Sequence, residues 1–128
     1  MRSLTSCLIV IIFLFAGCKK SDKSTDTSTN SIIGSWNWLK TTHGWAPQTT
    51  PATEHYNEVR VFQTNGSYYD YRNGVYFKRG SFILLASTAD LYTITIDGIT
   101  QPLTFEDASH IHFGFGSGDG DEYYYERQ

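Results

Sequence analysis

Turn dipeptides recur at short intervals along the chain and separate runs of residues that favour strands. Asn65-Gly66, Asn73-Gly74 and Asp97-Gly98 each sit between two such runs. These pairs supply the positive φ angles that tight hairpin turns require. No segment of about ten residues or more has helical periodicity. Because hairpins join strands that are neighbours in sequence, the pattern predicts an all-β domain built as an antiparallel meander.

The positions of these turns predict eight strands. They span Ile32–Lys40, Asn57–Gln63, Ser67–Arg72, Val75–Leu85, Leu91–Ile96, Ile99–Phe105, His110–Phe115 and Glu122–Arg127. The fourth is long, and we expect it to bend at Gly80. An open antiparallel sheet with no covering helix would leave two edges exposed, whereas closure into an up-and-down barrel removes both. The sequence therefore predicts an eight-stranded antiparallel barrel, with a two-sheet β-sandwich as the alternative.

Aromatic side chains supply much of the predicted interior. The chain has 3 Trp, 9 Tyr and 8 Phe, and all but Phe13 and Phe15 follow residue 31. Strand alternation places these residues on inward faces: Trp36, Trp38, Phe82, Leu84, Tyr92, Ile94, Ile96, Leu103, Phe105, Ile111, Phe113 and Phe115. Both faces of Ser67–Arg72 are aromatic, so its orientation stays open. An eight-stranded barrel is only just wide enough to be filled by side chains or to hold one small ligand.

The first residues of the chain are apolar and end on small residues before a cysteine. Arg2 gives a positive start, and Leu8–Phe15 is an apolar run too short to span a bilayer but suited to a signal-peptide core. Leu14–Cys18, Leu-Phe-Ala-Gly-Cys, resembles the lipobox of bacterial lipoproteins. The resemblance implies that residues 1–17 are a signal peptide and that Cys18 carries acyl chains that hold the protein on a membrane. An ordinary secretory signal is the alternative.

Residue 19 bears on where such a lipoprotein would reside. Lys19 follows the cysteine, whereas an aspartate there commonly retains lipoproteins at the inner membrane. The resemblance thus implies the outer membrane, with the choice between its periplasmic and outer faces left open. Residues 18–31 comprise the lipidated cysteine and a polar run that has no apolar residue to bury, so we expect a disordered tether. Residues 32–128 then form one domain.

Charge and cysteine content narrow the function classes. Loss of residues 1–17 removes Arg2 from the 10 Lys and Arg, which leaves 9 against 13 Asp and Glu, a net charge of −4. Nucleic-acid binding needs a basic face, so this balance argues against it. Cys7 leaves with the signal peptide and Cys18 carries lipid, so the domain has no disulfide and no thiol chemistry.

Three local patterns resemble the lipocalin-like domains of bacterial lipoproteins. They are Gly34–Trp36 (Gly-Ser-Trp), Phe62–Tyr68 together with Gly80–Leu84, and the final strand Tyr123–Arg127. The resemblance implies a calycin-type barrel in which Gly34 and Trp36 mark the closure and Arg127 packs over Trp36 in a cation–π contact. It also implies a small hydrophobic ligand inside the barrel.

The longest predicted loop, Thr41–Tyr56, follows the first strand. Loops of that length in compact domains are often functional, and ligands enter barrels at their mouths. The first hypothesis is therefore a binding module that takes a small apolar molecule through this end. Its candidate contacts are Trp38, Trp45, Tyr71 and Phe82. The alternative is a solid barrel whose aromatic exterior contacts another envelope protein or a glycan, with Trp45 capping the core.

Two clusters of polar residues contain side chains of the types that bind metal ions. His110 and His112 share a strand face and could hold zinc with His43 or His55 as a third ligand, but a solvated outer face is favoured. Asp119–Glu122 lacks the spacing of a calcium loop, so a plain hairpin turn is favoured. We expect no metal and no cofactor.

Catalytic motifs are lacking in the sequence. It contains no Gly-x-Ser-x-Gly elbow and no phosphate loop. Several carboxylates show no spacing that pairs them for acid–base work, and we expect them on the surface: Glu54, Glu58, Asp70, Glu106 and Asp107. The sequence therefore predicts a protein that is not an enzyme.

Overall fold

The computed structural model describes residues 31–86, 91–116 and 118–128. The predicted signal peptide, residues 1–17, and residues 18–30 of the predicted tether lie outside the described residues. In the part of the chain that is described, no helix has the length and apolar character needed to cross a bilayer.

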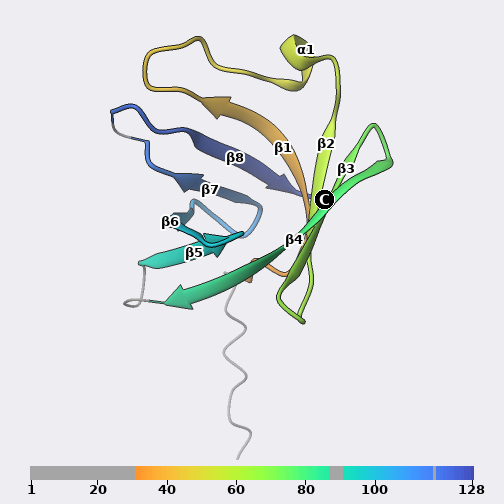
Figure 1. The fold of residues 1–128 in the computed structure, drawn as a ribbon, viewed down its shortest axis with the longest axis vertical. Helices are drawn as coiled ribbons and strands as arrows, with labels where there is room; N and C mark the ends of the chain where they lie inside the picture. The colour runs from red at the N-terminus through yellow and green to blue at the C-terminus, as the bar shows by residue number, and fades with distance from the viewer. Residues whose placement is uncertain (1–30, 87–90, 117) are drawn as a thin grey trace, which may run out of the picture.

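Eight antiparallel strands close into a barrel, which confirms the predicted fold class (Figure 1). In the described ranges the strands are β1 (Gly34–Thr42), β2 (Glu58–Phe62), β3 (Ser67–Arg72), β4 (Val75–Ala86), β5 (Tyr92–Ile96), β6 (Ile99–Phe105), β7 (His110–Gly114) and β8 (Glu122–Arg127). Each strand pairs with its neighbour in sequence, and β8 pairs with β1. The sandwich alternative is therefore wrong.

The connection between β1 and β2 is shorter than predicted, because β1 continues to Thr42 rather than ending at Lys40. It contains one short helix, α1 (Pro51–Glu54). Thr50 caps α1 through a capping box with Thr53, and the proline stands in the first turn, where its missing N–H costs nothing. The helix is too short to show a helical periodicity in the sequence, although its capping residues, Thr50 and Thr53, can be recognised there.

The barrel closes where Trp36 of β1 lies opposite Arg127 of β8. The guanidinium carbon of Arg127 lies 4.2 Å from the centroid of the Trp36 ring. The guanidinium also donates hydrogen bonds to the backbone carbonyls of Ser31, Ile33 and Ala108. Gly34 has a φ of 132°, and a Cβ there would lie 3.0 Å from Nη1 of Arg127. Glycine thus leaves room for the arginine, in the arrangement that the lipocalin resemblance implies.

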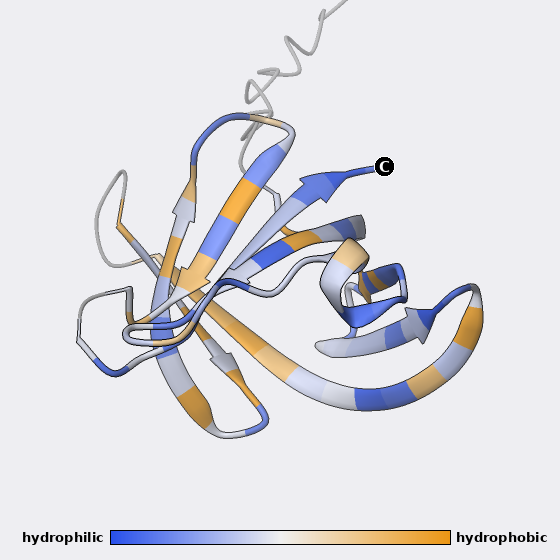
Figure 2. Cartoon of the chain, turned by 90° about the horizontal axis from the view of Figure 1, so that it is seen from above, coloured by the Kyte–Doolittle hydropathy of each residue, from blue (hydrophilic) through white to orange (hydrophobic). Residues whose placement is uncertain are grey.

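The apolar core fills the barrel interior around Trp36. Its buried members are Ile32, Trp36, Trp38, Phe62, Tyr68, Phe82, Ile94, Leu103, Ile111, Phe113 and Tyr125. Apolar and polar residues alternate along the strands (Figure 2). Of the residues predicted to face inward, Phe115 alone is exposed. The prediction fails there because β7 ends at Gly114, whose φ of 139° turns the chain before Phe115.

Two strand irregularities change which side chains face the interior. In β1 the pairing with β8 shifts between Trp38 and Lys40, which leaves Leu39 unpaired. As a result Trp38 and Thr41 are both buried, while Lys40 lies over the ring of Tyr124 outside the barrel. A bulge inserts one residue and so reverses the alternation beyond it.

The second irregularity lies in β4 and has the same effect. The pairing with β3 runs from Asp70 opposite Lys78 directly to Tyr71 opposite Tyr76, so Phe77 has no partner. Tyr71 and Tyr76 therefore pack edge to face on the outside, with ring centroids 6.3 Å apart. Phe77 turns toward the barrel mouth together with Lys78.

Replacing Arg127 by methionine should weaken the closure. We expect Arg127→Met to lower the free energy of unfolding by about 2 kcal/mol, because a cation–π contact and hydrogen bonds to carbonyls are lost. Urea denaturation of the domain measures this change. Arg79→Met is the matched control, since Arg79 is exposed on β4 and makes weaker contacts, one hydrogen bond to Ser67 at 3.2 Å and a cation–π contact with Tyr69 at 5.6 Å. It should cost less than about 1 kcal/mol. Equal effects of the two substitutions would contradict the closing role of Arg127.

Candidate functional site

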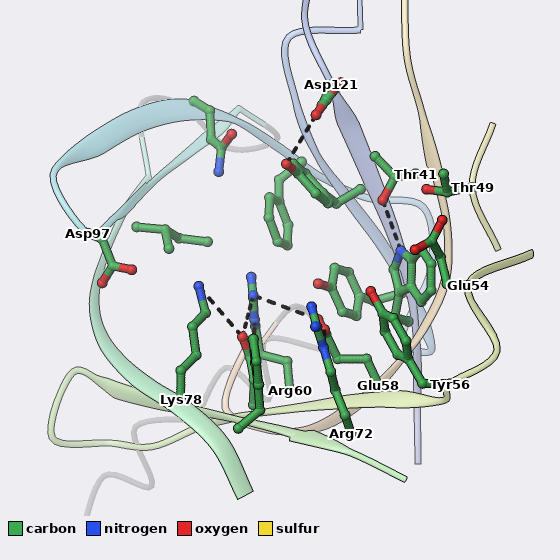
Figure 3. Close-up of a pocket in the computed structure, with 18 of the residues that line it drawn as sticks. Thr41, Thr49, Glu54, Tyr56, Glu58, Arg60, Arg72, Lys78, Asp97 and Asp121 are labelled. Carbon is green, nitrogen blue, oxygen red and sulfur yellow. Dashed lines mark hydrogen bonds and ion pairs between the residues drawn. The ribbon is translucent and has the colours of Figure 1, made fainter. Parts of the chain in front are cut away.

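A pocket of about 480 Å³ opens at the end of the barrel that carries α1 (Figure 3). Its walls come from all strands of the barrel and from the segment between β1 and β2. The lining residues that carry the argument below are Trp38, Tyr56, Glu58, Arg60, Asp70, Arg72, Phe77, Lys78, Asp97, Asp121, Tyr123 and Tyr125. The interior is thus packed at one end and hollow at the other.

Charged residues of β2, β3 and β4 form one wall of the pocket, which we call the charged wall: Glu58, Arg60, Asp70, Arg72 and Lys78. The strand register explains their proximity, because Glu58 lies opposite Arg72 and Asp70 lies opposite both Arg60 and Lys78. Directly opposite residues share a face of the sheet, so each carboxylate meets a cation.

Arg60 and Asp70 form a buried, bidentate ion pair at the base of the charged wall. Nε of Arg60 donates to Oδ1 of Asp70 at 2.7 Å, and Nη2 donates to Oδ2 at 2.8 Å. The two residues are 8% and 1% exposed. Burial alone would lower the pKa of Arg60, but Tyr125, Asp70 and Glu58 raise it above its ordinary value. The guanidinium therefore stays charged inside the barrel.

Arg72 stands next to this pair and is held between two aromatic rings. Its Nε donates to Oε2 of Glu58 at 3.0 Å. Its guanidinium carbon lies 4.2 Å from the ring centroid of Tyr56 and 3.8 Å from that of Phe77. Trp38 stacks on Tyr56, with centroids 5.8 Å apart and an interplanar angle of 23°. This stack gives the charged wall an aromatic edge.

Phenol groups and a carboxylate complete the remaining walls. The hydroxyl of Tyr68 donates to Asp97 at 2.5 Å. This bond, opposed by burial and assisted by the amide of Ser81, lowers the pKa of Asp97 below its ordinary value. Burial raises the pKa of Tyr125, so its hydroxyl is a neutral donor at the pocket.

The rim of the pocket is fastened by contacts between two segments far apart in sequence. Nδ1 of His43 lies 2.6 Å from Oδ1 of Asp121, and Nε1 of Trp45 donates to Asp119. Gly44 packs so closely on Gly118 that no Cβ would fit there. These contacts therefore hold the β1–α1 segment against residues 118–121 at the rim.

The structure places one of the four predicted ligand contacts at the pocket. Trp38 lines it, and its indole donates to Thr41 at 3.0 Å. Phe82 is buried in the apolar core, and Tyr71 faces outward against Tyr76. Trp45 is 88% exposed, so it neither lines the pocket nor caps the core.

Sequence reasoning missed the charged wall. Glu58 and Asp70, expected at the surface, are 9% and 1% exposed. The signal was present as two short patterns, Glu58-Val59-Arg60 and Asp70-Tyr71-Arg72, in which opposite charges two residues apart share a strand face. Because Val and Tyr alternate with these charges, hydrophobicity left the orientation of Ser67–Arg72 open and did not place the charges inside.

The predicted zinc pair, His110 and His112, lies outside the pocket lining, whereas the possible third ligand His43 and Asp121 of the acidic turn belong to that lining. His110 and His112 face away from the buried Ile111 and Phe113, and each lies near carboxylates: His110 with Asp107 at 2.9 Å and His112 with Glu106 at 3.0 Å. His43 contacts Asp121 rather than these two residues. Within residues 31–86, 91–116 and 118–128, no group of three His, Cys, Asp or Glu side chains is arranged to hold a metal.

Comparison of the chain with protein families, with curated proteins and with solved structures finds no significant match. The fold and the pocket therefore define the class to which the chain is assigned: a closed, eight-stranded antiparallel barrel with a polar pocket at one end.

Removing the buried carboxylate should be costly. We expect Asp70→Asn to lower the free energy of unfolding by about 3 kcal/mol or more, because Arg60 would remain buried without a counter-charge. Chemical denaturation measures the loss. Glu106→Gln is the control, since Glu106 pairs with His112 on the surface, and it should cost less than about 1 kcal/mol. The double variant Arg60→Met/Asp70→Leu should recover most of the loss, and failure to recover would contradict the ion-pair explanation.

Proposed function

We propose that this chain is a binding protein whose barrel takes a small molecule into the pocket at its open end. The observation that carries the proposal is the pocket itself, about 480 Å³ in volume and bounded by a closed sheet. Ligand sites commonly measure about 300–1,000 Å³. The geometry favours binding rather than catalysis, because the buried pocket carboxylates Glu58 and Asp70 are held in ion pairs and Asp97 accepts a hydrogen bond from Tyr68.

The lining changes the kind of ligand that the sequence suggested. A purely apolar molecule would cover the charged ends of Arg72 and Lys78 without replacing their hydration, which is costly. The aromatic edge formed by Trp38, Tyr56 and Phe77 nevertheless offers an apolar surface. We therefore propose a ligand with both a polar group and an apolar or aromatic body.

An interaction protein is the second candidate. The observation that favours it is a set of exposed apolar side chains that do not line the pocket: Tyr76, Ile83, Leu85 and Leu91. Exposed apolar side chains of this kind suit contact with another envelope protein or a glycan. This candidate requires no small molecule in the pocket, so the experiments below separate the two.

We propose that acyl chains on Cys18 carry the barrel on the cell envelope, at the outer membrane. The support is the lipobox-like sequence Leu14–Cys18 followed by Lys19. The polar residues between Cys18 and the start of β1 at Gly34 would separate the barrel from the lipid surface.

Mass spectrometry of the mature protein tests the anchor. We expect the N-terminal residue to be Cys18 with covalently attached acyl chains, and we expect Cys18→Ala to lose the lipid and to leave the membrane fraction. Protease treatment of intact cells then assigns the periplasmic or outer face. A mature protein that begins elsewhere, without lipid, would contradict the proposal.

The indole N–H signals of the three tryptophans test binding. We expect small naphthalene compounds at millimolar concentration to shift the Trp38 signal in a saturable manner, because Trp38 lines the pocket. The Trp36 signal should stay in place, since Trp36 is fully buried and outside the pocket lining. If no compound of any charge shifts Trp38, the binding function fails and the interaction protein is favoured.

A further inference from the structure

We propose that the pocket selects a small organic anion, with its carboxylate, phosphate or sulfonate group placed against the charged wall. This inference rests on the proposed binding function and names the ligand class for the same pocket. It depends on one comparison, between the hydrogen-bonding capacity left free on the cations of the wall and that left free on its carboxylates.

The guanidinium of Arg60 has N–H donors that no residue of the described chain accepts. A guanidinium carries five N–H groups, and Arg60 uses Nε and Nη2 to hold Asp70. Its Nη1 forms no hydrogen bond within the described residues. In the same residues, every fully buried side-chain nitrogen and oxygen has a partner, so Nη1 of Arg60 is at the pocket surface. A fixed, unbonded N–H pair on a permanent cation is a strong anion contact.

Two further cations stand beside Arg60. Figure 3 shows Lys78, Arg60 and Arg72 in a row, with their nitrogen ends directed into the same space. Nζ of Lys78 lies 3.9 Å from Oδ2 of Asp70, which is beyond hydrogen-bond length. Arg72 holds Glu58 through Nε, which leaves its two terminal nitrogens for a ligand. The wall thus carries three cations against two carboxylates.

Four of the five carboxylates that line the pocket are committed to partners in the described part of the chain, and the fifth, Glu54, is not. Asp70 accepts two bonds from Arg60, and Glu58 accepts one from Arg72. Asp97 accepts the Tyr68 hydroxyl and the amide of Ser81, and Asp121 contacts His43. Glu54 lies exposed on α1 at the rim. A cationic ligand would have to displace these internal donors, whereas an anion meets donors that are free.

The aromatic edge indicates what the anion is attached to. Tyr56 and Phe77 sandwich Arg72, and Trp38 continues the stack. A flat or apolar body bound along this edge would keep its charged group next to Arg72 and Lys78. Tyr125, which is buried and neutral and pairs with Trp38 across β1 and β8, adds a hydroxyl donor beside this edge. The pocket therefore fits an amphipathic anion better than inorganic phosphate.

Three naphthalene probes of equal size test the inference: 1-naphthaleneacetic acid, its neutral amide 1-naphthaleneacetamide, and the cationic 2-(1-naphthyl)ethylamine. Binding is followed by calorimetry and by the Trp38 indole signal. We expect the acid to bind about tenfold more tightly than the amide, because one charge-assisted hydrogen bond is worth about that factor. The amine should bind more weakly than the amide.

Variants of two lysines locate the effect. Lys78→Gln should weaken the acid at least about threefold and weaken the amide by a smaller factor, because only the acid loses a charge-assisted contact. Lys40→Gln is the matched control, since it removes the same charge outside the barrel, where Lys40 lies over Tyr124. Salt gives a test that needs no variant: raising NaCl from about 0.05 M to about 0.5 M should weaken the acid alone.

The outcomes separate this inference from the binding function. If the amide or the amine binds as tightly as the acid, the anion inference is overturned while the pocket remains a binding site. The same holds if Lys40→Gln weakens the acid as much as Lys78→Gln does. If no probe shifts Trp38, the binding function and the anion inference fail together.

Discussion

The pocket of this barrel depends on the ion pair between Arg60 and Asp70. Two charges at the centre of a β-barrel are stable only when each satisfies the other, and here two short hydrogen bonds do so. Because the pair occupies positions that apolar side chains would otherwise fill, the core stops beside it and the open end stays hollow. Glu58, Arg72 and Lys78 extend the polar layer up the wall. The ion pair thus sets both the boundary of the core and the chemistry of the pocket.

Barrel closure places these residues at one end. Trp36 and Arg127 join β1 to β8, and the buried indole donates to the carbonyl of Ile32 at 2.7 Å, so this seam leaves no unpaired indole donor. Aromatic side chains fill the barrel interior near the closed seam. The interior space that is left unfilled therefore lies at the mouth of the barrel. A single closed sheet therefore encloses the apolar core at one end and the polar pocket at the other.

The turn residues in the sequence allowed the fold to be predicted. Predicting the pocket would also have required the strand register, which the turn residues do not give. Asn-Gly and Asp-Gly pairs mark three hairpins from local backbone preferences alone. Closure was predicted because it removes both exposed sheet edges, and the structure decides it against the sandwich. The position of each side chain depends on longer-range pairing. The bulges at Leu39 and Phe77 reverse the alternation of their own strands, so Thr41 on β1 is buried and, on β4, Tyr76 faces outward while Phe77 lines the pocket. Charges two residues apart on β2 and β3 face inward because their partners lie on the neighbouring strand, which no single strand reveals.

Hydrogen exchange at the Nε–H groups of the arginines tests the central claim most directly. Two hydrogen bonds within a buried pair should make the Nε–H of Arg60 exchange far more slowly than that of the exposed Arg79, and saturation of the solvent signal should leave it intact. The account predicts that the Nε–H of Arg60 is more strongly protected than those of Arg72 and Arg127, whose Nε–H groups are hydrogen-bonded but less buried. Exchange at Arg60 as fast as at Arg79 would show that the pair is open to water, and the explanation of both core and pocket would then be contradicted.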